Sequence, residues 1–136
     1  MMKMSTYLAF NGQCATAFDF YQQALGGEVV EKHTFAASPM ADQVPADWGD
    51  KIMHINLKVG EQYLMGCDSA EAQAGFKGFN MVLGVDNVAD AERLFAALSP
   101  NANIMMPLDK TFWAERFGML VDQFGVTWAV NCDLPA

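Results

Sequence analysis

The segment CATAFDFYQQALGG, residues 14–27, decides the fold of the first half of the chain. Its apolar residues recur every three or four positions, as on the buried face of an amphipathic helix, at Cys14, Ala17, Phe18, Tyr21 and Leu25. Gly26 and Gly27 predict the helix end, because glycine adopts the left-handed conformation of a C-terminal cap without steric cost. Strands are predicted on either side, over residues 6–11 and 28–35.

The next segment predicts a long loop and then a hairpin. Residues 36–50 contain two prolines and a glycine without periodicity, and long loops of this kind often act as lids or interface arms. Strands are predicted over 52–59 and 62–67, joined by a tight turn at Gly60-Glu61. A polar linker follows over residues 68–78.

The second half repeats this order. A strand is predicted over 80–85, then a helix capped by Asp86 or Asn87 and ending before Ser99-Pro100. Three strands follow, over residues 102–107, 115–121 and 126–131, and Asp122 is expected to cap the turn before the last one. Offsets of 74 and 65 residues superimpose parts of the two halves. We therefore predict an α+β domain over residues 1–136, made of two βαβββ modules at about 1–68 and 78–136.

Composition limits the function. The chain of 136 residues is 52% hydrophobic and carries a net charge of −8, with its eight basic residues scattered. This charge argues against nucleic acid and anionic membrane surfaces as partners, because phosphate binding needs clustered Lys and Arg. No apolar run approaches the length of a membrane span, and no leader is recognisable. Three cysteines without a CxxC pair fit a reducing compartment, so we expect a cytoplasmic protein.

Several motifs resemble the vicinal oxygen chelate (glyoxalase, bleomycin-resistance and dioxygenase) superfamily. FYQQALGG at 20–27 resembles its FYxxxLG helix end, and DQFG at 122–125 resembles its DPxG turn. YLAFNG at 7–12, MHIN at 53–56 and TFWAERFG at 111–118 are similar to the PhnB-like branch, as is DQFGVTW at 122–128. The resemblance runs nearly end to end. It implies two cupped mixed sheets around a cavity for a small molecule.

The resemblance also implies where a metal would lie. In metal-dependent relatives, four ligands come from the first and last strands of each half, and they align here with Thr6, Leu64, Asn80 and Ala129. Two of these side chains have no donor atom, whereas a divalent cation needs carboxylate, imidazole or thiolate groups to replace its water. We therefore predict no metal ligands and no cofactor, and we disfavour a divalent metal.

His54 is the candidate acid or base. It shares one face of its strand with Asn56 and Lys58, and the other face is apolar. A two-residue turn at Gly60-Glu61 is expected to direct the apolar face toward the cavity, and a three-residue turn is expected to direct His54 toward it. The sequence leaves both alternatives open, and His54 is either a ligand-binding or acid–base residue or a half-buried core histidine.

Further candidates come from the second half. Trp113 offers a flat apolar wall and Arg116 a clamp for a carboxylate or phosphate, although each could be structural. The predicted ligand-binding residues are thus Thr6, His54, Asn56, Asn80, Trp113 and Arg116. Asp68, at a strand end, is expected in a solvated turn or at a pocket rim.

Two functions from different classes fit these features. The first is a small-molecule-binding protein without the usual metal site. The second is a lyase, isomerase or dioxygenase-like enzyme acting on a small oxygenated metabolite, with His54 as acid or base or with a displaced metal. Motifs for serine hydrolases, phosphate-binding loops and dinucleotide or methyl-donor folds are absent. Exposed sheet edges and the loop over 36–50 favour a homodimer.

Overall fold

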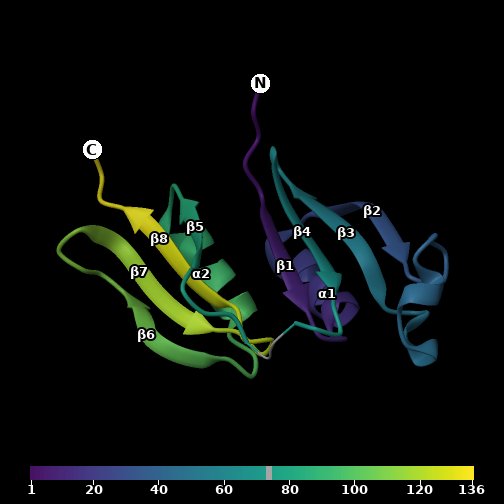
Figure 1. Cartoon of the computed structure of the whole chain (residues 1–136). Helices are drawn as coiled ribbons and strands as arrows, with labels where there is room; N and C mark the ends of the chain where they lie inside the picture. Colours follow the sequence, from purple (N-terminus) through teal and green to yellow (C-terminus); the bar gives the residue numbers. More distant parts are fainter. Residues whose placement is uncertain (73–74) are drawn as a thin grey trace. The chain divides into compact units, whose positions relative to one another are not determined.

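The computed structural model describes residues 1–72 and 75–136 and has two compact units, Met1–Ala74 and Gly75–Ala136. Each unit is a βαβββ module, which confirms the predicted α+β fold (Figure 1). The first unit contains β1 (Thr6–Phe10), α1 (Cys14–Leu25), β2 (Glu28–Thr34), β3 (Ile52–Val59) and β4 (Gln62–Asp68). The second contains β5 (Met81–Val85), α2 (Val88–Leu98), β6 (Asn103–Asp109), β7 (Ala114–Val121) and β8 (Thr127–Asp133).

Helix α1 covers one face of the first sheet (Figure 1). Its apolar stripe is fully buried there, with Ala17, Phe18 and Tyr21 each 0% exposed. The helix ends at Gly26, whose φ of 76° is the left-handed cap predicted from the sequence and whose N–H donates to the Gln22 carbonyl. The local sequence therefore fixes both the length of α1 and the face that it buries.

The first sheet has the strand order β1-β4-β3-β2. Strands β1 and β4 are parallel, whereas β4 with β3 and β3 with β2 are antiparallel. A Cβ atom added at Gly66 on β4 would lie 2.6 Å from Cε1 of Phe18, so the sheet approaches α1 too closely there for any side chain. Gly66 pairs with Ile55, which places Ile55 on the same helix-facing side.

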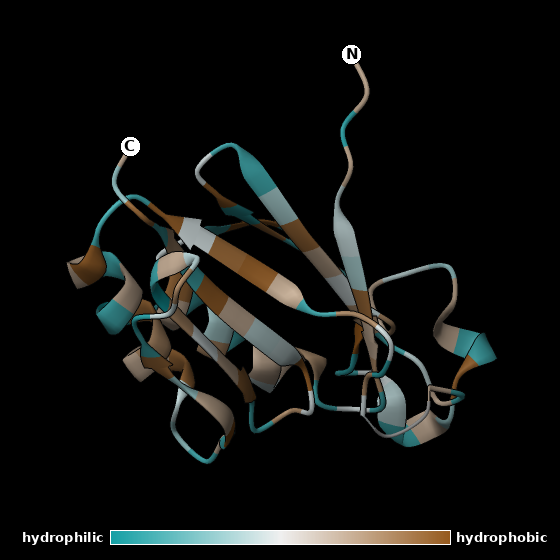
Figure 2. Ribbon diagram, turned by 90° about the vertical axis from the view of Figure 1, so that its left-hand side faces the viewer, coloured by the Kyte–Doolittle hydropathy of each residue, from teal (hydrophilic) through white to brown (hydrophobic). Residues whose placement is uncertain are grey.

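The second unit follows the same plan, with the order β5-β8-β7-β6 and α2 against one face. Asn87 caps α2, because its side chain accepts a hydrogen bond from the Asp90 N–H at 2.8 Å. Trp128 and Val130, at 1% and 0% exposed, form the core under this helix. In Figure 2 the strands change between brown and paler or teal residues along their length, as strands with one buried face should.

The segment between β2 and β3 contains two single turns of 3-10 helix, η1 (Ala41–Gln43) and η2 (Ala46–Trp48), within the predicted loop. The ring of Trp48 lies 6.2 Å from that of Phe35, measured between centroids, and this contact folds the loop back on the end of β2. Within the described residues, neither α-helix is long and apolar enough to cross a membrane.

Candidate functional site

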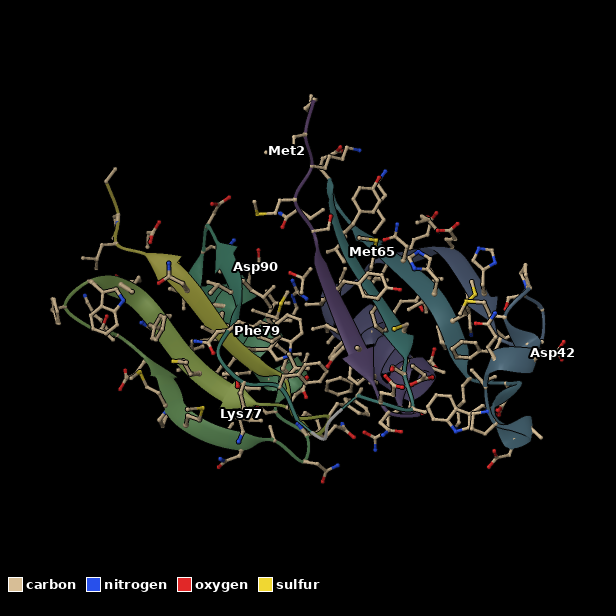
Figure 3. All side chains as sticks on the ribbon, in the orientation of Figure 1. Met2, Asp42, Met65, Lys77, Phe79 and Asp90 are labelled. Carbon is tan, nitrogen blue, oxygen red and sulfur yellow. The ribbon has the colours of Figure 1, made fainter. Side chains whose placement is uncertain are left out.

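The candidate site lies on the face of the first sheet that points away from α1. His54 and Asn56 alternate along β3 with Ile55 and Leu57, which are 2% and 0% exposed under α1, so the two polar side chains lie on the opposite side. Antiparallel pairing with β2 places His33 beside His54 and Glu31 beside Asn56. We call this the polar face, and it carries Tyr7, Glu31, His33, His54 and Asn56. Met65, labelled in Figure 3, pairs with Asn56 on the same side.

Short contacts join four side chains of the polar face in a row. The Tyr7 hydroxyl lies 3.2 Å from Nδ1 of His54. On the other side of the ring, Nε2 of His54 lies 3.0 Å from Oε1 of Glu31. The second carboxylate oxygen, Oε2, lies 3.2 Å from Nε2 of His33. Glu31 thus bridges two imidazoles through separate oxygens, and His54 lies between a carboxylate and a phenol.

The surroundings set the protonation of two members of this row, Glu31 and Tyr7. The hydrogen bond from His33 and the charges of both histidines hold the pKa of the Glu31 carboxyl below its ordinary value of 4.5. Tyr7 is 48% exposed, yet partial burial of its phenol, with a contribution from Cys67, raises its pKa to about 12. At neutral pH, Glu31 is therefore a carboxylate and Tyr7 a neutral phenol.

Two further polar groups border the row. Among the residues that the structure describes, the buried Oδ1 of Asn56 has no hydrogen-bond partner, which is unusual because a buried acceptor normally finds a donor. The thiol of Cys67, on β4, interacts with the Tyr7 hydroxyl, and burial raises the pKa of this thiol. The polar face thus places an acceptor without a described partner beside a histidine that contacts both a phenol and a carboxylate.

The structure determines the orientation of β3, which the sequence left open. It also corrects the expected relation between the length of the turn and that orientation. The turn at Gly60-Glu61 has two residues, since Val59 pairs with Gln62 and Leu57 with Leu64. From the sequence, a two-residue turn is expected to direct the apolar face of β3 toward the cavity. Instead, that apolar face packs on α1 and His54 lies on the side away from the helix, because Leu64 itself faces α1 and is 5% exposed.

The aligned metal positions do not lie on equivalent faces. Thr6 shares a side of β1 with Leu8 and Phe10, which are 1% and 3% exposed under α1, so Thr6 and its partner Leu64 face the helix. In the second unit, Ala129 alternates with the buried Trp128 and Val130 and faces away from α2, and Asn80 lies exposed just before β5. The predicted offsets of 74 and 65 are therefore wrong for the strands.

The parallel ladders give the correct offsets. The first ladder begins with Thr6 opposite Leu64 and the second with Met81 opposite Trp128, so the offset is 75 for the first strands (6 to 81) and 64 for the last strands (64 to 128). The 74-residue offset holds for the helices, where Ala17 and Ala91 are both 0% exposed. The connection from the first strand to the helix is thus one residue shorter in the second unit.

The side chains away from the helices do not fit a divalent metal either. With the corrected offsets, these positions on the paired strands are Tyr7 with Met65 and Val82 with Ala129. The phenol and thioether of the first unit are poor ligands for a hard or borderline cation, and the two hydrocarbon side chains of the second unit have no donor atom. Over residues 1–72 and 75–136, no group of three or more His, Cys, Asp or Glu side chains is arranged to hold a metal ion.

The predicted residues of the second half, Trp113 and Arg116, lie in the second unit, where each makes contacts within that unit. Trp113 is 45% exposed, and its ring packs between those of Phe112 and Phe117 at centroid distances of 4.9 and 5.5 Å. Arg116 pairs with the buried Cys132 and faces α2, where its Nε lies 3.9 Å from Glu92. Its Nη1 donates to the Glu115 backbone carbonyl at 2.7 Å and lies 3.8 Å from Oε1 of Glu115, so two carboxylates of the same unit lie beside this guanidinium.

Sequence reasoning missed Tyr7, Glu31 and His33. Glu31 and His33 alternate along β2, which places them on one face of that strand. Two irregularities in the β2–β3 register and the long connection after β2 hide the fact that His33 lies opposite His54. Asp68 was also misjudged: it is 2% exposed and accepts three backbone hydrogen bonds, so it belongs to the core.

Known proteins resemble the chain over nearly its whole length. Protein YjdN of Escherichia coli (strain K12) is 34% identical over 139 residues, covering 96% of this chain and 95% of that protein. The crystal structure of protein PA1353 from Pseudomonas aeruginosa is 47% identical, with a TM-score of 0.89 and 98% of each chain covered.

A third relative bears on the PhnB-like resemblance. The PhnB protein of Bacillus cereus, named a putative 3-demethylubiquinone-9 3-methyltransferase, is 22% identical with a TM-score of 0.81, covering 96% of this chain and 99% of that one. At this identity the likeness shows the fold alone. The sequence model of the Glyoxalase/Bleomycin resistance protein/Dioxygenase superfamily matches residues 3–130, and the chain belongs to that superfamily.

Proposed function

We propose that the chain is a small-molecule-binding protein whose ligand contacts the polar face of the first unit. The row from Tyr7 through His54 to Glu31 carries the proposal, because three hydrogen-bonding groups of different character lie side by side on one sheet face. Oδ1 of Asn56, which has no partner within residues 1–72 and 75–136, supports it, since a ligand donor would satisfy this buried acceptor. Binding sites commonly combine a few such polar groups with apolar surroundings.

The second candidate function is an enzyme that uses His54 as general acid or base. The observation that favours it is the position of His54 between the Glu31 carboxylate and the Tyr7 phenol. A carboxylate that orients a histidine toward a hydroxyl group is the arrangement that many enzymes use to transfer a proton. A substrate oxygen or carbon acid beside Tyr7 would then exchange its proton with this pair.

The test is a screen of small oxygenated and aromatic metabolites by ligand-observed NMR, with His54→Ala as the variant and Glu61→Gln, in the exposed turn, as the matched control. We expect compounds that bind the native chain and the control to lose their binding to His54→Ala, whose melting temperature stays within a few degrees of the native value. Equal binding to all three proteins would contradict the proposal. A lower melting temperature without a change in binding would make His54 a core histidine.

We also propose that ligand binding needs no metal. The poor metal-binding chemistry of Tyr7 and Met65 in the first unit, and of Val82 and Ala129 in the second, supports this. Elemental analysis of the purified protein, before and after treatment with a chelator, should find no stoichiometric divalent metal and no change in thermal stability. A bound metal at one equivalent, with loss of ligand affinity on chelation, would favour the enzyme with a displaced metal site.

A cytoplasmic homodimer remains our proposal for the assembly. The free thiols of Cys14, Cys67 and Cys132 are consistent with a reducing compartment. Strand β6 is an edge of its sheet and exposes Ile104 and Met105 at 41% and 57%. Light scattering coupled to gel filtration should give twice the monomer mass, and a monomer at micromolar concentration would contradict the dimer.

A further inference from the structure

The hydrogen bonds of His54 fix its tautomer. Glu31 is a carboxylate and can only accept, so the contact of 3.0 Å to Nε2 requires a proton on Nε2. A neutral imidazole carries one N–H, which leaves Nδ1 with a lone pair. The Tyr7 hydroxyl, 3.2 Å away, must then donate its proton to Nδ1.

This arrangement determines what Tyr7 offers to a ligand. While His54 is neutral, the single hydroxyl hydrogen of Tyr7 is directed at the imidazole, and only oxygen lone pairs remain for a ligand. When His54 takes up a proton, Nδ1 becomes an N–H donor and the Tyr7 oxygen becomes its acceptor. The hydroxyl hydrogen is then released and can be donated to another group.

We propose that Tyr7 is the specificity-determining residue of the polar face, and that it selects a ligand oxygen that accepts a hydrogen bond, such as a carbonyl oxygen, with uptake of one proton by His54. The inference rests on the proposed binding function and names the ligand class and the proton that accompanies it. The proton balance is simple: solvent supplies one proton to Nδ1 of His54, and no covalent bond to the ligand forms or breaks.

The groups around His54 are compatible with its protonation. On β2, Glu31 and His33 face it, with the two imidazole rings stacked at a centroid distance of 6.5 Å. Tyr7 faces it from β1. On β4, Gly66 pairs with Ile55, and Cys67 is the next residue along that strand. Lys58 lies on the same face of β3. The Glu31 carboxylate is the nearest charge, so an imidazolium at His54 gains an ion pair.

The first experiment needs no ligand. The chain has two histidines, so long-range proton–nitrogen NMR spectra of the rings are assigned with a single His33→Gln variant. We expect the neutral form of His54 to carry its proton on Nε2, and Glu31→Gln to convert it to a mixture of tautomers. The exposed control Glu61→Gln should leave the spectrum unchanged. A neutral His54 with its proton on Nδ1 would overturn the inference.

The second experiment uses acetophenone, an uncharged probe whose oxygen only accepts hydrogen bonds. The absence of charge matters because protonation of His54 also changes the local electrostatic field. We expect its affinity for the native chain to rise about fivefold when a lower pH protonates His54, as one additional hydrogen bond provides. At every pH, Tyr7→Phe should bind acetophenone with the weaker affinity that the native chain shows at high pH. The variant His33→Gln should keep the pH dependence.

The outcomes separate the two proposals. One informative result is that acetophenone binds the polar face with the same affinity at all pH values, and another is that its pH dependence survives in Tyr7→Phe. Either result would overturn the role of Tyr7 and leave the proposed binding function intact. If acetophenone shifts no signal of the polar face at any pH, the proposed function fails, and the role of Tyr7 fails with it even if the tautomer is the one expected.

Discussion

Asp68 accepts a hydrogen bond from the backbone N–H of Ile52 through Oδ2, at 3.0 Å, although the two residues end and begin different strands. Its other oxygen accepts from the N–H groups of Gly12 and Cys14, at 2.9 and 3.0 Å. One buried carboxylate therefore joins the end of β4 to the start of β3 and to the first turn of α1. The polar face depends on this junction, because β3 carries His54 and β1 precedes Gly12.

Replacing Asp68 should destabilise the first unit strongly. Asp68→Ala leaves three backbone donors without an acceptor, and we expect the free energy of unfolding to fall by about 3 kcal/mol. Asp68→Asn should lose less, since one amide oxygen can still accept. Urea denaturation gives these values, with Asp133→Asn on the exposed end of β8 as the control. A loss in Asp68→Ala no larger than in the control would contradict this role.

The close approach of sheet and helix predicts a contrast among three glycines. Gly66→Ala would place Cβ 2.6 Å from Phe18 and 2.9 Å from the Leu8 carbonyl, and Gly118→Ala would place it 2.7 Å from Phe95. We expect each to lower the free energy of unfolding by about 1–3 kcal/mol. At Gly84 an added Cβ meets no atom of the described residues within 4 Å, so Gly84→Ala is the matched control and should be nearly neutral.

The raised pKa of Tyr7 predicts its behaviour in alkali. A phenol with a pKa of about 12 in the folded chain, against an ordinary value of 10.0, stabilises the folded state below pH 10, and this contribution is lost as the pH rises from 10 to 12. Absorbance titration of phenolate should show a component near pH 12 that disappears in Tyr7→Phe. Its persistence in that variant would assign the component to another tyrosine.

The lowered pKa of Glu31 predicts the opposite dependence in acid. A depressed carboxyl pKa stabilises the folded chain above pH 4.5, and the contribution is lost as the pH falls through the folded value. The effect on stability is small because Glu31 is exposed. Carbon NMR of the side-chain carboxyl is the direct measurement. His33→Ala should raise the Glu31 midpoint more than His54→Ala, because the hydrogen bond from His33 is the largest cause of the shift.

Much of the fold could be predicted because local signals agree with the final structure. The spacing of Ala17, Phe18 and Tyr21 determines the buried face of α1, and Asn87 and Gly26 act as the caps that their chemistry favours. Asp122 also behaves as expected, since it accepts from the N–H groups of Phe124 and Val126 within its own turn. In each case the interacting groups lie within a few residues of one another.

The site was harder to predict because it depends on pairing between distant strands. A one-residue shift moves every side chain to the other face, and the offset that fits the helices is wrong by one for the strands. The same sensitivity hid the contact between Tyr7 and His54, which lie on β1 and β3 with β4 between them. Asp68 was misjudged because all three of its donors come from other segments of the chain.

The parallel pairing of β1 with β4 has a consequence for synthesis on the ribosome. Thr6 finds its neighbour Leu64 only after nearly the whole first unit has been made, so β1 waits as an unpaired strand while α1, β2 and β3 emerge. Once β4 is available, the first unit has every strand of its own sheet and can close before the second unit is translated. The interval before β4 emerges is the period in which the nascent chain exposes the apolar stripe of α1 and most needs protection from aggregation.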